Sequence, residues 1–346
     1  MALVVLTDNC NLSCQACFRP REPKRGARPW SFTELESCLN ELVGAGQPFV
    51  AYTGGEPSLW RDGEKTLADL LVTSNRLGLS PMFVTNGHAF RNDDSTRALL
   101  DRYFELTQAP LHVVVSVDLW HDDTWVEGRS RALESLSRWL EANADTNVLE
   151  VEVASLWCLD DSYNIHSEHF ARYTEAGIRI SYLPLSPIGR AHSLSELAPT
   201  LLANGTCKGS LGSYGQVLRQ RMNIAEEEWS ELPNSKLYGP CVAVTNLTLD
   251  MDRRYWLCND RAGENLSVGP VGSLTAASIQ ACLERNPIVK SFLDSGLVDA
   301  IRECAQGSGV LSAASASALL QQHHHYGISG RASCGLCQHV PQECFS

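Results

Sequence analysis

The stretch CNLSCQAC, residues 10–17, decides the fold and the chemistry predicted for this chain. It places three thiols at the spacing C-x3-C-x2-C directly after residues 3–7, an apolar run typical of a buried strand. Three thiolates on one short loop can hold three irons of a [4Fe–4S] cluster, which ordinarily takes four cysteines. One iron would then be open to a small molecule. The alternatives are a zinc site, which needs a fourth ligand nearby, and buried free cysteines.

A second motif, Gly54-Gly55-Glu56-Pro57, follows another apolar run at residues 49–53. Two glycines after a strand let the backbone approach a ligand closely, and the carboxylate of Glu56 can bind a cationic group. Pro57 fixes the turn. By itself a Gly-Gly pair is most often a plain turn, so the motif gains its meaning from the three cysteines that precede it.

Together, the two motifs resemble those of the radical S-adenosylmethionine (SAM) superfamily. The resemblance implies that the open iron binds the amine and carboxylate of SAM. It implies a cluster held by Cys10, Cys14 and Cys17, with cofactor contacts from Phe18, Gly54, Gly55 and Glu56. The implied reaction is the cleavage of SAM to methionine and a 5′-deoxyadenosyl radical, which removes a hydrogen atom from a substrate.

The first 190 residues alternate short apolar runs with longer amphipathic ones, which predicts parallel βαβ units. The expected strands are residues 3–7, 49–53, 81–85, 111–117, 148–155 and 178–183, and the expected helices 33–45, 64–78, 94–107, 128–143 and 166–176. Ser31 and Glu34 have the spacing of a capping box before the first helix. Six such units match the partial (β/α)6 barrel of the radical SAM family, an α/β fold.

Further site residues are expected where the later strands end, because parallel α/β folds bind ligands at the carboxyl ends of their strands. A Thr-Asn-Gly turn at residues 85–87 also recurs in the family. The resemblance assigns substrate or SAM contacts to Ser116, Asp118 and Arg190. His121 suits the wall of a pocket for a polar substrate, and Glu152 and Ser155 on the fifth strand are further candidates for SAM contacts. Of these, Asp118, His121 and Arg190 are the catalytic candidates, and Ser116, Glu152 and Ser155 are the cofactor-binding candidates.

The C-terminal third contains a second set of cysteines. Cys241 and Cys258 bracket an alternating, hairpin-like stretch, and Cys334 and Cys337 form a C-x2-C pair. In isolation four thiols favour zinc, but behind a radical SAM barrel they resemble the SPASM or twitch domain with an auxiliary [4Fe–4S] cluster. The match is imperfect, since Arg253 stands where the family has glycine, and Cys304 or Cys344 are alternative ligands. The implied parts are a barrel at 1–191, a linker at 192–240 and this cysteine-rich cluster-binding domain at 241–346.

Composition narrows the class of protein. The formal net charge of −12 and the isoelectric point near 5.3 argue against nucleic acid as a partner. No apolar run is long enough to span a membrane, and the first residues lack the basic region of a signal peptide, so we expect a cytoplasmic enzyme. The exception to the acidic character is FRPREPKRGARPW at residues 18–30, either a solvated loop or a docking patch for an acidic flavodoxin or ferredoxin reductant.

For the substrate, the resemblance favours a small sugar-like, aminocyclitol or nucleoside molecule in natural-product biosynthesis. The chain resembles the 2-deoxy-scyllo-inosamine dehydrogenase type, with net oxidation aided by the auxiliary cluster. Peptide modifiers often carry an N-terminal recognition domain, and the cluster motif here begins at Cys10. The alternatives are radical modification of a ribosomal peptide, a redox-neutral epimerisation, dehydration or decarboxylation, and a non-catalytic iron–sulfur or zinc scaffold.

Overall fold

The computed structural model describes residues 1–14, 17, 28–116, 126–144, 148–157, 173, 175–184, 247–257 and 266–285. Within residues 126–130, 155–157 and 180–184 it describes the backbone but not the side chains. Every structural statement below concerns these residues.

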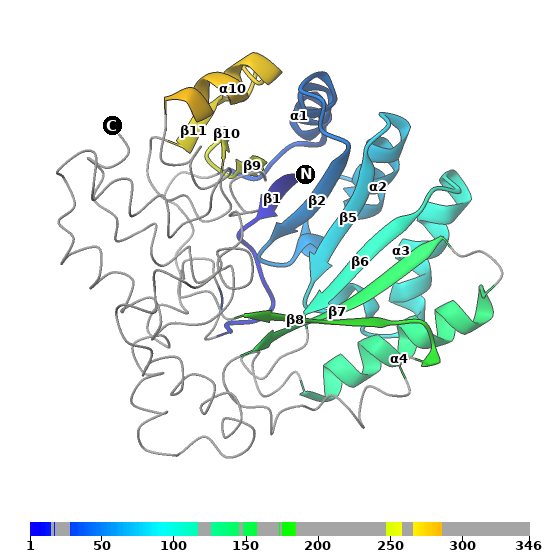
Figure 1. Cartoon of the computed structure of the whole chain (residues 1–346). Helices are drawn as coiled ribbons and strands as arrows, with labels where there is room; N and C mark the ends of the chain where they lie inside the picture. Colours follow the sequence, from blue (N-terminus) through cyan, green and yellow to red (C-terminus); the bar gives the residue numbers. More distant parts are fainter. Residues whose placement is uncertain are drawn as a thin grey trace, which may run out of the picture.

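Six parallel strands form the body of one twisted sheet (Figure 1). They are β1 (Ala2–Thr7), β2 (Phe49–Gly54), β5 (Ser80–Thr85), β6 (Leu111–Ser116), β7 (Leu149–Trp157) and β8 (Arg179–Pro184), adjacent in that order. All six strands predicted from the sequence are confirmed, with ends displaced by one or two residues. The mostly parallel α/β sheet of the expected fold is therefore present.

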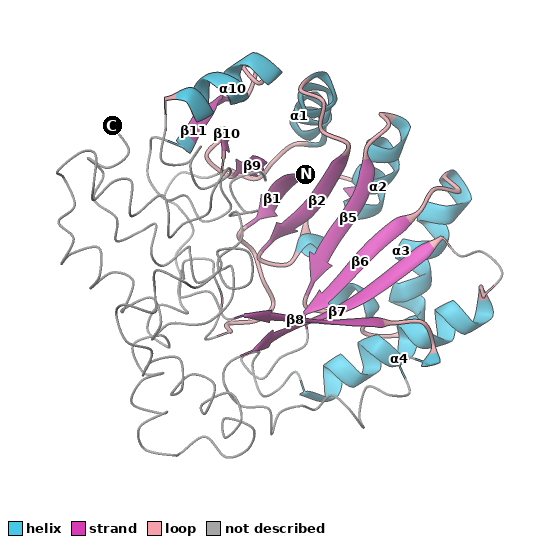
Figure 2. Ribbon diagram, in the orientation of Figure 1, coloured by secondary structure: helices cyan, strands magenta, loops and turns pink. Residues whose placement is uncertain are grey.

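Four helices connect these strands and cover one face of the sheet, as Figure 2 shows. They are α1 (Phe32–Gly44), α2 (Leu67–Arg76), α3 (Asp93–Leu106) and α4 (Val126–Ala142). Each confirms a predicted helix, whereas most of the fifth predicted helix, 166–176, lies outside the described residues. The capping box is confirmed: the Ser31 side chain accepts from the Glu34 backbone amide, and the Glu34 carboxylate accepts from the Ser31 amide.

The alternation of side chains along the strands separates the core from the inner face of the sheet. On β6 and β7, Val113, Val115, Val151 and Val153 are buried in the hydrophobic core, together with helix residues such as Leu100. Residues at the intervening positions, such as Ser116 and Glu152, therefore face away from the helices. This places polar side chains on the inner face, the side that could receive a ligand.

A C-terminal segment extends the same sheet beyond β1. Strands β9 (Leu247–Asp250) and β10 (Arg254–Trp256) form an antiparallel hairpin, followed by β11 (Ser267–Pro270) and α10 (Ala276–Glu284). The hairpin predicted between Cys241 and Cys258 is confirmed. Its pairing was not predicted: β9 lies parallel to β1, with Ala2 opposite Leu247, so the hairpin continues the barrel sheet.

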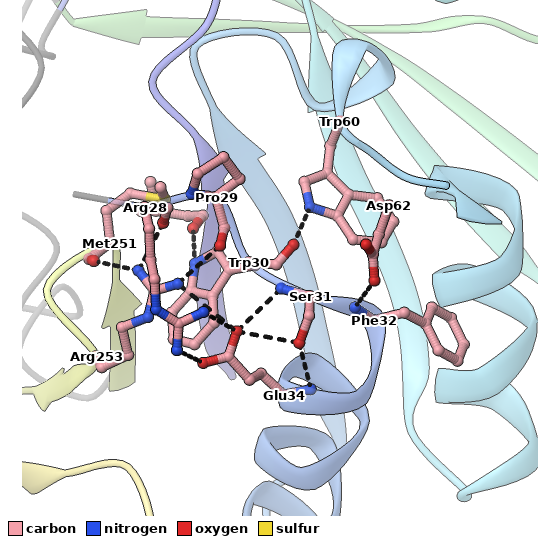
Figure 3. A network of polar contacts seen from close by, with 11 residues as sticks. Arg28, Pro29, Trp30, Ser31, Phe32, Glu34, Trp60, Asp62, Met251 and Arg253 are labelled. Atoms are coloured by element: carbon pink, nitrogen blue, oxygen red, sulfur yellow. Dashed lines mark hydrogen bonds and ion pairs between the residues drawn. The ribbon is translucent and has the colours of Figure 1, made fainter. Parts of the chain in front are cut away.

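Arg253, in the turn of this hairpin, joins it to the segment that leads into α1 (Figure 3). Its guanidinium donates to the carbonyl oxygens of Arg28, Pro29 and Met251, at 2.7, 2.9 and 2.8 Å, and lies 4.1 Å from the centroid of the Trp30 ring. We call these contacts, together with the ion pair to Glu34 at 3.7 Å, the Arg253 clamp.

The backbone of Arg253 has φ 60°, in the left-handed region that favours glycine. The resemblance to the SPASM or twitch domain led us to expect glycine at this position, and glycine would adopt this φ without strain. Here the contacts of the guanidinium offset the strain of a non-glycine residue. The clamp therefore fastens the C-terminal hairpin to the chain segment that returns from the cysteine loop.

Two-residue strands β3 (Arg61–Asp62) and β4 (Lys65–Thr66) pair with each other, and single-turn 3-10 helices cover Pro57–Leu59 and His88–Phe90. In the part of the chain that the structure describes, no helix is both long and apolar enough to cross a membrane.

Candidate active site

The exits of β1 and β2 meet through backbone hydrogen bonds. The amide of Gly55 donates to the Thr7 carbonyl at 2.7 Å, and the amide of Glu56 donates to the Asn9 carbonyl at 2.8 Å. A Cβ atom on Gly54 would lie 2.3 Å from the Thr7 carbonyl oxygen, and one on Gly55 would lie 2.2 Å from that of Asn9. The glycines thus allow the backbone to approach the loop that begins with Cys10. The sequence predicted a close approach, but to a ligand.

The Glu56 carboxylate is fully buried and binds donors from two strand exits. It accepts from the amide and hydroxyl of Ser58 at 3.1 and 2.6 Å, from the Thr85 hydroxyl at 2.9 and 3.0 Å, and from the Asn86 amide at 2.8 Å. A carboxylate offers about four lone-pair sites, so these contacts fill its accepting capacity. We call the set Glu56, Ser58, Thr85 and Asn86 the strand-end network.

Burial shapes the electrostatics of this network. Desolvation raises the pKa of Glu56, while the hydrogen bonds from Ser58, Asn86 and Thr85 oppose that shift. The donors are neutral hydroxyls and backbone amides, which leave the negative charge of an ionised Glu56 uncompensated. An ionised Glu56 would therefore attract a cationic group brought close to it. That property suits the ammonium or sulfonium group of SAM.

The cysteine loop supplies soft donors next to this network. Cys10, Cys14 and Cys17 are thiols of intermediate exposure that form no disulfide. The Leu12 amide donates to the Cys10 sulfur at 3.4 Å, and the Asn86 side-chain amide reaches the same sulfur at 3.6 Å. Within the described residues no three Cys, His, Asp or Glu side chains are arranged to hold a single metal ion. The fit to a [4Fe–4S] cluster therefore rests on donor chemistry: three thiols, with N–H donors already directed at one of them.

Two predicted cofactor residues lie further along the sheet. Ser116 ends β6 beside Ala154 of β7, and Glu152 lies two residues before Ala154 on the same inner face. The Glu152 carboxylate is 3.3 Å from the His112 ring and 3.8 Å from the Arg179 guanidinium. For Ser155 the structure describes only the backbone, which pairs with Tyr182 in the sheet.

Several predicted site residues lie outside the described residues. They are Phe18, Asp118, His121, Arg190, Cys241, Cys258, Cys334 and Cys337, with the alternative ligands Cys304 and Cys344. The structure brings together the Cys10 loop, Gly54-Gly55-Glu56 and the Thr-Asn-Gly turn at the carboxyl ends of β1, β2 and β5. It does not test the other positions.

Sequence reasoning missed the role of the Thr-Asn-Gly turn. It treated residues 85–87 as a tight turn, and Gly87 does adopt φ 90°. The structure adds that Thr85 and Asn86 contact Glu56 directly, and that Asn86 also contacts Cys10. A signal was available, since each of the three motifs follows a strand and adjacent parallel strands end at one edge.

Comparison with protein families supports this arrangement. Residues 4–148 match the model of the radical SAM superfamily. Curated relatives include the PqqA peptide cyclase of Rhodopseudomonas palustris, 33% identical over 84 residues, and the Fe-coproporphyrin III synthase of Methanosarcina barkeri, 27% identical over 82 residues. Each alignment covers 24% of this chain, and the chain spans only 21% and 20% of the respective relatives.

Solved structures show the same fold. Streptococcus suis SuiB bound to S-adenosylmethionine gives a TM-score of 0.51 at 15% identity, covering 96% of this chain and 76% of that one. The anSMEcpe structure with bound AdoMet gives 0.50 at 14% identity, covering 85% and 82%. The family match supports the predicted superfamily, and with it the predicted [4Fe–4S] cluster and SAM as cofactors, while the solved structures by themselves show the fold alone. They do not single out an aminocyclitol dehydrogenase.

Proposed function

We propose that this chain is a radical SAM enzyme that binds its cluster and SAM at the carboxyl ends of β1, β2 and β5 and abstracts a hydrogen atom from a substrate. When bound, these cofactors supply the reductive cleavage of SAM that generates a 5′-deoxyadenosyl radical. The observation that carries the proposal is the convergence of three strand exits, where Gly55 and Glu56 hold the Cys10 loop and the Thr-Asn-Gly turn together.

The residues have separate tasks in this proposal. Cys10, Cys14 and Cys17 hold the cluster, and the residues around Glu56 frame the SAM site. Ser116 and Glu152 offer polar groups on the inner face of β6 and β7, where they can orient a bound molecule. The predicted contacts of Phe18, Asp118, His121, Ser155 and Arg190 remain part of the proposal.

The proposed auxiliary cluster uses Cys241, Cys258, Cys334 and Cys337 in a domain of the SPASM or twitch type. Strand β10 runs antiparallel to β9 and β1, so its last residue, Trp256, lies toward the amino edge of the sheet. That edge is opposite to the one where the Cys10 loop begins. Whether the auxiliary cluster accepts an electron or only supports the fold decides between net oxidation and a redox-neutral reaction.

For the substrate we propose a peptide, because the curated relatives include a peptide cyclase. A small polar molecule of the sugar or aminocyclitol class is the second candidate. The observation that favours it is the group of polar side chains on the inner face, His112, Ser116 and Glu152, which could bind hydroxyl groups. A flavodoxin or ferredoxin is the proposed source of the electron.

The test uses the anaerobically reconstituted full chain with SAM and dithionite. We expect formation of 5′-deoxyadenosine, measured by chromatography, and its rate should rise when the true substrate class is added. The probes are a short peptide encoded beside the gene and 2-deoxy-scyllo-inosamine. Stimulation by the peptide alone supports the peptide proposal, and stimulation by the aminocyclitol alone overturns it. Reconstituted protein that holds iron but forms no 5′-deoxyadenosine would favour a non-catalytic scaffold.

A further inference from the structure

We infer that the side chain of Asn86 sets the reduction potential of the cluster by donating a hydrogen bond to the Cys10 sulfur. This inference rests on the proposed function in one respect, since it takes Cys10 to be a cluster ligand. The carrying observation is the distance of 3.6 Å from the Asn86 amide nitrogen to that sulfur. Asn86 is a positioning residue, because it acts on the cluster through a ligand.

The hydrogen bonds of Asn86 fix which end of its amide faces the sulfur. Its side-chain oxygen accepts from the His88 backbone amide at 3.0 Å, which identifies that end as the acceptor. The nitrogen end therefore points the other way, where it donates to the Asn11 side-chain oxygen at 2.9 Å and reaches Cys10. With the amide turned over, the His88 amide would face an NH₂ group and two oxygens would face each other at Asn11.

The backbone of Asn86 is equally constrained. Its amide donates to Glu56 at 2.8 Å, and the following Gly87 holds the turn with φ 90°. The Gly87 amide in turn donates to the Thr85 hydroxyl at 3.0 Å. Asn86 is only 7% exposed, so water competes little for its amide. A substitution of the side chain leaves the backbone contact with Glu56 in place.

Hydrogen bonds to cluster sulfurs are one of the means by which a protein tunes cluster potential. A donor stabilises the more negative, reduced state more than the oxidised state, so it raises the potential and eases reduction. In a buried site the effect is larger than in water, because the local dielectric constant is low. Removing the Asn86 donor should therefore make the cluster harder to reduce.

The primary test is a redox titration of the SAM-binding cluster in the reconstituted full chain, followed by electron paramagnetic resonance. The signal that changes on SAM addition identifies that cluster. We expect Asn86→Leu, which keeps the size and removes the donor, to lower the equilibrium constant for one-electron reduction three- to tenfold, about 28–59 mV. Asn86→Asp, which places an acceptor at the sulfur, should lower it further. Asn11→Ala is the matched control. It removes the other acceptor of the Asn86 side-chain amide but keeps the donor to the Cys10 sulfur, so the reduction potential should stay unchanged.

A second measurement uses the unsubstituted chain. Protein containing asparagine labelled with ¹⁵N at the side-chain amide should show a ¹⁵N coupling to the reduced cluster, retained in Asn11→Ala. This measurement decides the matter if the Asn86 variants fail to retain a cluster. A wild-type potential in Asn86→Leu with full cluster content, or an absent ¹⁵N coupling, would overturn the inference. Failure of the unsubstituted chain to assemble any cluster would instead refute the proposed function.

Discussion

The strand-end network and the Arg253 clamp both hold a chain segment with one charged group, but they do so in opposite ways. In the network, the buried Glu56 carboxylate accepts from neutral donors within residues 56–86. In the clamp, the partly exposed Arg253 donates to carbonyl groups more than 220 positions earlier in the chain. The network lies where three motifs meet, whereas the clamp attaches the C-terminal hairpin. We therefore expect damage to the network to affect both folding and cofactor binding, and damage to the clamp to affect stability alone.

The largest effect is expected from Gly55→Ala. The new Cβ would lie 2.2 Å from the Asn9 carbonyl oxygen, so the Cys10 loop and the β2 exit could not keep their contact. We expect the variant to lose about 3 kcal/mol or more of unfolding free energy and to lose its iron. Urea denaturation followed by circular dichroism, with iron analysis, measures both.

Gly44→Ala is the matched control. Gly44 ends α1, and an added Cβ there meets nothing within 4 Å. It should be neutral or slightly stabilising. Equal stability of Gly55→Ala and Gly44→Ala would contradict the close approach of the two strand exits.

Glu56→Gln is expected to have the next largest effect. An amide cannot accept from all the donors that surround Glu56, so one buried donor is left without a partner, at about 1–3 kcal/mol. SAM affinity should also fall, by roughly 10- to 150-fold if a charge-assisted hydrogen bond of about 1.5–3 kcal/mol is lost. Equilibrium binding of SAM and urea denaturation check the two parts separately.

Thr85→Val separates the two ways in which Glu56 can act on SAM. It removes one donor to Glu56 and keeps the carboxylate. If Glu56 acts by holding the strand ends around the site in place, both Thr85→Val and Glu56→Gln should weaken SAM binding. If the Glu56 carboxylate contacts SAM directly, only Glu56→Gln should weaken SAM binding. The exposed Glu36→Gln on α1 is the control, and unchanged SAM affinity in Glu56→Gln would show that the carboxylate serves the turn alone.

The Arg253 clamp should tolerate glycine better than alanine. Arg253→Ala loses the hydrogen bonds and the contact with Trp30, about 2 kcal/mol in total, and keeps a left-handed backbone that alanine disfavours. Arg253→Gly loses the same contacts but removes the backbone strain, about 1 kcal/mol. Urea denaturation should therefore rank wild type, Gly, Ala, with SAM affinity unchanged in both variants. An alanine variant at least as stable as the glycine variant would argue against strain at this turn.

The smallest effect concerns pH. Although partial burial opposes it, hydrogen bonds from Arg28 and Ser31 lower the pKa of Glu34 to about 2. Because the folded pKa lies below the unfolded value near 4.5, Glu34 stabilises the fold above pH 4.5 and loses this contribution as pH falls toward 2. The stability difference between wild type and Glu34→Gln should shrink across this window, as measured by urea denaturation at each pH. A difference that stays constant from pH 5 to pH 2.5 would contradict the lowered pKa.

The sequence predicted the parallel strands well, because their signals are local. The mainly apolar run at residues 111–115, for example, identifies β6 from its own residues alone. The pairing of β9 with β1 could not be predicted, because no local pattern specifies which edge a distant hairpin joins. The contact of Asn86 with Cys10 spans 76 positions and depends on the register of three strands. Likewise, a glycine-to-arginine difference at position 253 became interpretable only once its φ and its partners were known.

The central claim is that the Cys10 loop holds the cluster that cleaves SAM, next to the strand-end network. It is tested most directly by comparing the wild-type chain with the triple variant Cys10→Ala, Cys14→Ala and Cys17→Ala after anaerobic reconstitution. The wild type should hold about 8 iron atoms, as two [4Fe–4S] clusters, and form 5′-deoxyadenosine with SAM and dithionite. The triple variant should keep about half of the iron, in the auxiliary cluster, and form no 5′-deoxyadenosine. Undiminished SAM cleavage by a folded triple variant would contradict the claim.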